Sequence, residues 1–157
     1  KVGGEVNGCV FHGCSNKAHA GYLGDSYVGE WVNLGAGTTT SNLKNTYGQV
    51  KMQLAGDAAS VSTGMVNLGS IIGDHVKTAI GTRLLTGSCI GTGAMVAVSG
   101  LAPKYVPPFA FLTDTGTERY ELERFCQVAD RMMQRRDQRM DAELTQTVAD
   151  LHRQSIS

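Results

Sequence analysis

A six-residue period runs through most of this 157-residue sequence and constrains its fold more than any other feature. Between residues 66 and 101, the first position of each hexad is aliphatic in five of six cases, and the fifth is small or β-branched. Reading backwards from Leu34 gives six more hexads, again without a large fifth residue. This pattern predicts a β-solenoid in which each hexad forms a short strand and a turn. Three hexads make one coil, and coils stack about 4.8 Å apart, so twelve hexads predict four coils.

The glycine content supports this interpretation. The chain has 20 glycines, and each glycine in a helix interior would cost about 1 kcal/mol relative to alanine. The predicted fold class is therefore mainly β: a parallel β-helix with an inserted loop and a C-terminal α-helical tail.

Two segments interrupt the period. Residues 40–65 fit no hexad, and we expect them to form an insertion with a strand over residues 50–54. Proline cannot continue a strand ladder, so we expect the three prolines after Leu101 to end the coils. The predicted domains are residues 1–110, including the insertion at 40–65, and a helical tail at 115–155.

The tail is glycine-free from Glu118 to the end and has a helical period. Thr115 and Glu118 have the spacing of a capping box, and a second helix is expected to begin near Asp141. We expect the helices to pack on the solenoid or on a neighbouring subunit. The basic run at 135–139 is interpreted as a solvated helix face rather than a phosphate site.

Fourteen basic residues balance fourteen acidic ones, which argues against a nucleic-acid or membrane partner. No run approaches the roughly 18 apolar residues of a membrane span. The four cysteines are scattered, and no secretory signal precedes them, so the prediction is a cytoplasmic protein. Because the repeat is already running at Lys1, we interpret the chain as a fragment of a longer polypeptide.

One block is more specific than the hexads: His19-x-x-Tyr22-Leu23-Gly24-Asp25, then residues 33–38 as Asn-Leu-Gly-Ala-Gly-Thr, then Asn42. The sequence thereby resembles the C-terminal domain of bifunctional glucosamine-1-phosphate acetyltransferase/N-acetylglucosamine-1-phosphate uridyltransferases. The resemblance implies a left-handed β-helix, a homotrimer, and acetyl-CoA in clefts between subunits. It also implies an N-terminal nucleotidyltransferase domain, absent from this chain, for which alone Mg²⁺ is expected.

The resemblance implies an acetyl-CoA-dependent N-acetyltransferase that acts on an amino-sugar 1-phosphate in UDP-N-acetylglucosamine and cell-envelope precursor synthesis. His19 is the expected general base, a role that suits histidine because its pKa lies near neutrality. The remaining predicted site comprises Asn33 beside the base; Lys17, Tyr22, Asn42 and Lys44 for the sugar phosphate; and Gly35, Ala36, Ala79 and Ala97 for acetyl-CoA. Turn stabilisation by the asparagines, and packing of Tyr22 and the alanines, are the structural alternatives.

Two departures keep other functions open. Where the family has phosphate-binding lysines, this sequence has Asn7 and Gly48. The alternative is a non-catalytic, trimerising and regulatory β-helix domain of a sugar-1-phosphate nucleotidyltransferase. A further alternative, a zinc enzyme of the β-helix carbonic anhydrase type, would need His12, His19 and His75 at a subunit interface; no metal site is predicted.

Overall fold

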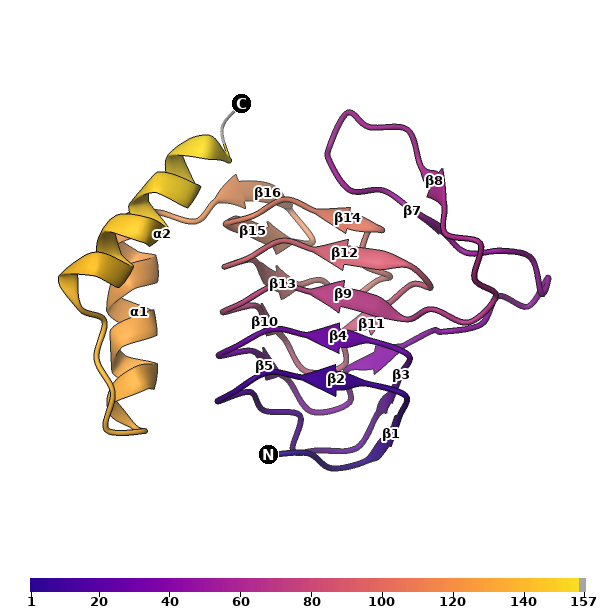
Figure 1. The fold of residues 1–157 in the computed structure, drawn as a ribbon, viewed down its shortest axis with the longest axis horizontal. Coiled ribbons are helices and arrows are strands. Elements are labelled where there is room, and N and C mark those ends of the chain that lie inside the picture. Colours follow the sequence, from indigo (N-terminus) through magenta and orange to yellow (C-terminus); the bar gives the residue numbers. More distant parts are fainter. Residues whose placement is uncertain (156–157) are drawn as a thin grey trace.

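The computed structural model describes residues 1–155 as a three-faced parallel β-solenoid with a hairpin on one side and two helices on the other (Figure 1). We name the faces A, B and C in the order in which the chain crosses them. Face A contains β1 (Glu5–Asn7), β3 (Tyr22–Gly24), β6 (Thr39–Thr40) and β11 (Arg83–Leu84). Face B contains β2 (Val10–Phe11), β4 (Tyr27–Val28), β9 (Ser70–Ile72), β12 (Ser88–Ile90) and β14 (Tyr105–Val106). Face C contains β5 (Asn33–Leu34), β10 (Lys77–Thr78), β13 (Met95–Ala97) and β15 (Ala110–Thr113).

Columns of inward side chains fill the solenoid. On face C, Leu34, Thr78 and Val96 lie in register on neighbouring strands and are buried. Ile72 and Ile90 do the same on face B. Because successive residues of a strand point to opposite sides of the sheet, alternate residues point into the solenoid. The inward residues of the three faces together form one apolar core. The predicted fold class, a left-handed parallel β-helix with an inserted loop and a helical tail, is confirmed.

The hexad frame is wrong at the N-terminal end. Glu5 pairs with Tyr22, 17 residues later, so one turn in this part of the chain is a residue shorter than a strict hexad allows. Consequently Leu23, not Tyr22, is the fully buried residue that points into the core. Lys17, six residues before Leu23, takes the preceding inward position and is only 2% exposed at the open end of the solenoid.

The coils do not end at Leu101, contrary to the sequence prediction. Strand β14 pairs in parallel with β12, and β15 pairs with β13. Face B therefore stacks five strands, one more than four coils would supply. The prolines are accommodated because Pro103, Pro107 and Pro108 all lie between strands, where no ladder hydrogen bond is required.

The insertion leaves the solenoid between faces A and B. Paired strands on either side of it are 44 residues apart in sequence, as with Tyr27 and Ile71, against 18 for Ile71 and Cys89 in the next coil. Within it, β7 (Lys51–Met52) and β8 (Val61–Ser62) form an antiparallel hairpin that projects from the solenoid (Figure 1).

The tail begins with a strand rather than a helix. Strand β16 (Gly116–Arg119) pairs antiparallel with β15, so the predicted capping box of Thr115 and Glu118 is wrong. Helix α1 (Leu122–Gln134) follows, and α2 (Ala142–Gln154) begins where predicted, with the Asp141 carboxylate accepting a hydrogen bond from the Leu144 N–H at 2.8 Å. Both helices pack beside the solenoid, on the side away from the hairpin (Figure 1).

Candidate active site

An aromatic column fixes α1 against the solenoid. Trp31, His75, Gly93 and Phe109 occupy the same turn of successive coils, between faces B and C, and all have positive φ. Phe125 of α1 inserts here, with its ring centroid 5.5 Å from that of His75 and 5.2 Å from that of Phe109. A side chain on Gly93 would block it, since a Cβ there would lie 3.0 Å from the Phe125 ring. The glycine therefore makes room for the helix.

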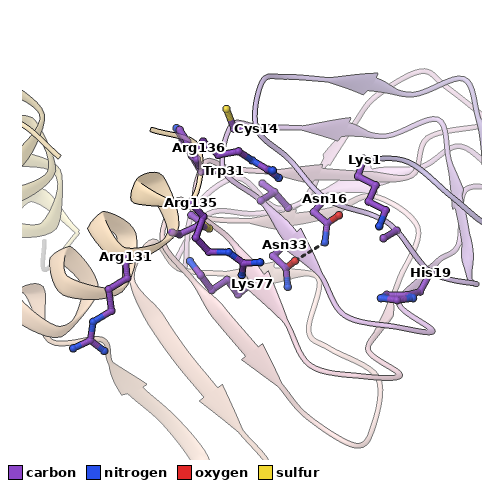
Figure 2. A pocket seen from close by; sticks show the side chains of 13 residues that line it. Lys1, Cys14, Asn16, His19, Trp31, Asn33, Lys77, Arg131, Arg135 and Arg136 are labelled. Atoms are coloured by element: carbon purple, nitrogen blue, oxygen red, sulfur yellow. Dashed lines mark hydrogen bonds between the residues drawn. The ribbon is translucent and has the colours of Figure 1, made fainter. Parts of the chain in front are cut away.

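A cleft of about 610 Å³ lies between face C and the C-terminal end of α1. Asn16, His19 and Asn33 line it from the solenoid, and Arg135 lines it from the end of α1. In Figure 2 the arginines at and just after the C-terminal end of α1 occupy one end of the cleft and His19 the other, with Asn16 and Asn33 between them. The cleft is thus elongated, and its two ends differ chemically.

The helix end of the cleft is strongly cationic. Lys77, Arg131, Arg135 and Arg136 line the cleft, and none of its lining residues is Asp or Glu. The two salt bridges found within residues 1–155 involve other arginines. Burial lowers the pKa of Lys77 from its ordinary value of 10.5 to about 8. This end of the cleft is suited to an anion.

The middle of the cleft offers amide donors. The Asn16 Nδ2 donates to the Asn33 Oδ1 at 2.8 Å, across two neighbouring coils (Figure 2). This hydrogen bond fixes the orientation of the Asn33 amide and leaves its Nδ2 without a partner among the described residues. Asn33 can therefore donate to a carbonyl oxygen of a ligand.

His19 lies on the turn between faces C and A, with an exposed side chain. Its backbone carbonyl accepts a hydrogen bond from the Lys17 Nζ at 2.7 Å, and Lys17 also donates to the Gly3 carbonyl at 3.2 Å. Burial lowers the pKa of the Lys17 amine. Lys17 thus supports the backbone under His19 and does not line the cleft.

The other predicted sugar-phosphate residues lie outside the cleft. Tyr22 and Asn42 meet at the far end of face A, where the Asn42 Nδ2 donates to the Asp25 carboxylate at 2.6 Å. Burial, together with the charges of Asp25 and Glu5, raises the pKa of Tyr22. Lys44 donates to the Gln49 carbonyl in the insertion. The structure therefore separates the predicted site residues into two groups: His19 and Asn33 line the cleft, whereas Tyr22, Asn42 and Lys44 lie away from it.

Three predicted acetyl-CoA residues form one column. Gly35, Ala79 and Ala97 follow paired positions on successive strands of face C, and the same line passes through Ala18, which lines the cleft. Gly35 also has a packing role, since a Cβ there would come within 2.6 Å of the Ala79 backbone. Ala36 lies beside this column, and its carbonyl accepts from the Gly81 N–H at 2.8 Å.

The sequence pattern does not single out the arginines at the end of α1. The side chains of Arg135 and Arg136 are exposed, as the prediction of a solvated run at 135–139 requires, and they also line the cleft. A cluster of basic residues without acidic partners was the available signal. His75, part of the zinc alternative, is packed between the rings of Trp31 and Phe125 rather than presented at the surface. Residues 1–155 contain no group of three His, Cys, Asp or Glu side chains placed to hold a metal ion.

None of the described helices is long and apolar enough to cross a membrane.

Comparison with known proteins identifies similar sequences. A bifunctional sugar-1-phosphate nucleotidylyltransferase/acetyltransferase from Sulfurisphaera tokodaii is 39% identical over 92 residues, which are 59% of this chain and 22% of that protein. The bifunctional protein GlmU of Methanococcus vannielii is 28% identical over 108 residues, 69% of this chain and 25% of that protein. The predicted resemblance is confirmed. The chain covers about a quarter or less of the length of these bifunctional relatives.

No family model matches the chain. Among solved structures, the polysialic acid O-acetyltransferase OatWY aligns over 73% of this chain and 58% of its own, with a TM-score of 0.33 and 15% identity. At that level of likeness we draw nothing from it about function.

Proposed function

We propose that the chain is an acetyl-CoA-dependent N-acetyltransferase that acts on an amino-sugar 1-phosphate. Its similarity to bifunctional proteins named as acetyltransferases supports a transferase role in general. The observation that carries the specific proposal is that His19 and Asn33 line the same elongated cleft as a cluster of cations. The candidate base and the anion-binding end are thereby available to one ligand.

In the proposed reaction, the neutral sugar amine attacks the thioester carbonyl carbon, forming a C–N bond as the C–S bond breaks. His19 accepts the amine proton and then returns it to the leaving thiolate. The free Nδ2 of Asn33 donates to the carbonyl oxygen as negative charge develops on it. A general base of this kind contributes about 10²–10⁴ in rate.

We further propose that the active form is a homotrimer. Val10, Tyr27 and Ile71 occupy paired positions on β2, β4 and β9, and their side chains are 56%, 41% and 37% exposed. An exposed apolar row along a flat sheet face is suited to contact with another subunit. This row equally supports the alternative function, a non-catalytic trimerising and regulatory domain. A single monomeric species on size measurement at micromolar concentration would contradict both assemblies.

The relatives are bifunctional and much longer than this chain, so we propose that it works beside a sugar-1-phosphate nucleotidyltransferase domain, the only part expected to use Mg²⁺. A cytoplasmic location and a place in UDP-N-acetylglucosamine synthesis remain predictions of the resemblance.

The test is release of free thiol from acetyl-CoA in the presence of amino-sugar 1-phosphates. We expect turnover with at least one amino sugar, and a loss of about 10²–10⁴-fold in kcat for His19→Ala. Asp57→Ala is the control, because Asp57 is exposed in the insertion and lies outside the cleft lining. Turnover by His19→Ala at the parental rate would refute the catalytic assignment and leave the scaffold alternative.

A further inference from the structure

The positive charge at the helix end of the cleft lacks a partner within the described chain. Lys77, Arg135 and Arg136 line this end without a facing carboxylate, and neither of the two salt bridges in residues 1–155 involves them. Like charges gathered in one cleft repel each other and destabilise the folded state. An anionic ligand would remove that cost.

The simplest structural explanation concerns the helix itself. Basic residues at a helix C-terminus interact favourably with the helix dipole, an effect of about 0.3–1 kcal/mol at exposed sites. That role explains why a basic residue lies near the last turn of α1, but not the direction in which its side chain points. Figure 2 shows Arg131 pointing away from the solenoid, whereas Arg135 reaches across the cleft toward Asn33 and Lys77.

Lys77 supports the same conclusion from the opposite wall. It lies on β10 of the solenoid, its Nζ donates to the His75 carbonyl at 3.2 Å, and burial lowers its pKa to about 8. A half-buried lysine with one neutral partner can donate its other N–H groups to a ligand. Two elements distant in sequence therefore bring cations to one place.

We propose that Lys77, Arg135 and Arg136 form a binding site for two adjacent phosphoryl groups, with the turn that follows α1 supplying the arginines from the same chain. Three cations match a diphosphate better than a monophosphate, which carries at most two negative charges. Arginine is suited to this role because its planar guanidinium binds phosphate in a bidentate manner. The diphosphate site rests on the proposed function only for the identity of the diphosphate that occupies it.

Two sources of a diphosphate fit this chemistry: the nucleotide end of acetyl-CoA, and a nucleoside triphosphate or nucleotide sugar. An acetyl-CoA molecule bound here would run along the cleft past Asn33 toward His19 (Figure 2). A nucleotide would need no contact with His19.

The chain has a built-in reporter for this site. Trp31 is its single tryptophan, and it lines the cleft. Pyrophosphate is titrated into the full chain while Trp31 fluorescence is followed, and calorimetry gives an independent Kd. We expect saturable binding, at least tenfold tighter than that of inorganic phosphate, and weaker at high salt.

Arg135→Gln should weaken pyrophosphate binding at least tenfold. Arg139→Gln, an exposed arginine in the same basic run that does not line the cleft, should leave the Kd unchanged. Both replacements are at exposed positions, so folding is retained and far-UV circular dichroism should match the parent. Absence of saturable binding, or equal losses in the two variants, would overturn the proposal.

Competition then identifies the source of the diphosphate. Displacement of pyrophosphate by CoA at lower concentration than by UTP assigns the site to the acyl donor, and the reverse order assigns it to a nucleotide; both support the site. Binding without thiol release in the acetyl-transfer assay would refute the proposed function alone. His19-dependent turnover without pyrophosphate binding would refute only the diphosphate site.

Discussion

The His75 side chain should make the fold sensitive to acid. Its side chain is only 6% exposed, its ring stacks on Trp31 and meets the edge of Phe125, and its buried Nδ1 has no hydrogen-bond partner among the described residues. Burial, with a smaller contribution from the Lys77 charge, lowers the pKa of His75 from 6.5 to about 4. The folded state therefore keeps this histidine neutral.

The consequence for stability follows from linkage. Between pH 6.5 and pH 4 the unfolded chain binds a proton at His75 that the folded chain does not, so the free energy of unfolding falls as pH decreases. A pKa difference from 6.5 to about 4 corresponds to a loss of about 2 kcal/mol at pH 5 and about 3 kcal/mol at pH 4. Above pH 6.5, His75 is neutral in both the folded and the unfolded chain, and it causes no loss in the free energy of unfolding.

The assay is urea unfolding at a series of pH values, followed by circular dichroism. His75→Gln removes the titrating ring, so we expect it to be less stable at pH 7 but to lose about 2 kcal/mol less than the parent between pH 7 and pH 5. His12→Gln, at an exposed position, is the matched control and should keep the parental slope. Parallel pH profiles for the parent and His75→Gln would refute the reasoning.

Three other changes test separate parts of the structure. Phe125→Ala should cost about 3–5 kcal/mol in urea unfolding and weaken pyrophosphate binding, because α1 loses its anchor on the solenoid; unchanged stability would contradict the docking. Asp141→Ala should lower the free energy of unfolding by about 1 kcal/mol, because it removes the cap of α2, whereas Thr115→Ala should leave the helix content unchanged. A loss of helix content in Thr115→Ala together with unchanged stability in Asp141→Ala would favour the capping box predicted from the sequence. Pyrophosphate should bind about tenfold more weakly at pH 9 than at pH 7 as the Lys77 amine loses its proton, and Lys77→Arg should remove the part of this dependence that the lysine contributes; identical profiles would exclude Lys77 from the site.

The solenoid was predictable because its signal is local. The inward columns that hold Ile72 and Ile90 recur at nearly fixed spacing, and that spacing alone predicts stacked coils. The frame failed at Tyr22 and Leu23 because a turn can shorten by one residue without changing which strands pair. A one-residue slip moves a side chain to the opposite face, and no feature of the residues themselves reveals it.

The candidate site was predictable only in part, for a different reason. A short block of sequence singles out His19 and Asn33, and both line the cleft, while their catalytic roles stay predictions. The position of Arg135 could not be predicted because it depends on how α1 packs on the solenoid, which brings Arg135 to the same cleft as Lys77, 58 residues away in sequence. Overall charge balance also concealed the cleft, since 14 acidic residues offset 14 basic ones elsewhere on the chain.

The most direct test is an experimental structure of the chain with CoA bound. We predict that CoA occupies the cleft between face C and α1, with its diphosphate between Arg135 and Lys77 and its sulfur within reach of His19. A CoA molecule bound with its sulfur remote from His19, or at another surface of the solenoid, would contradict it.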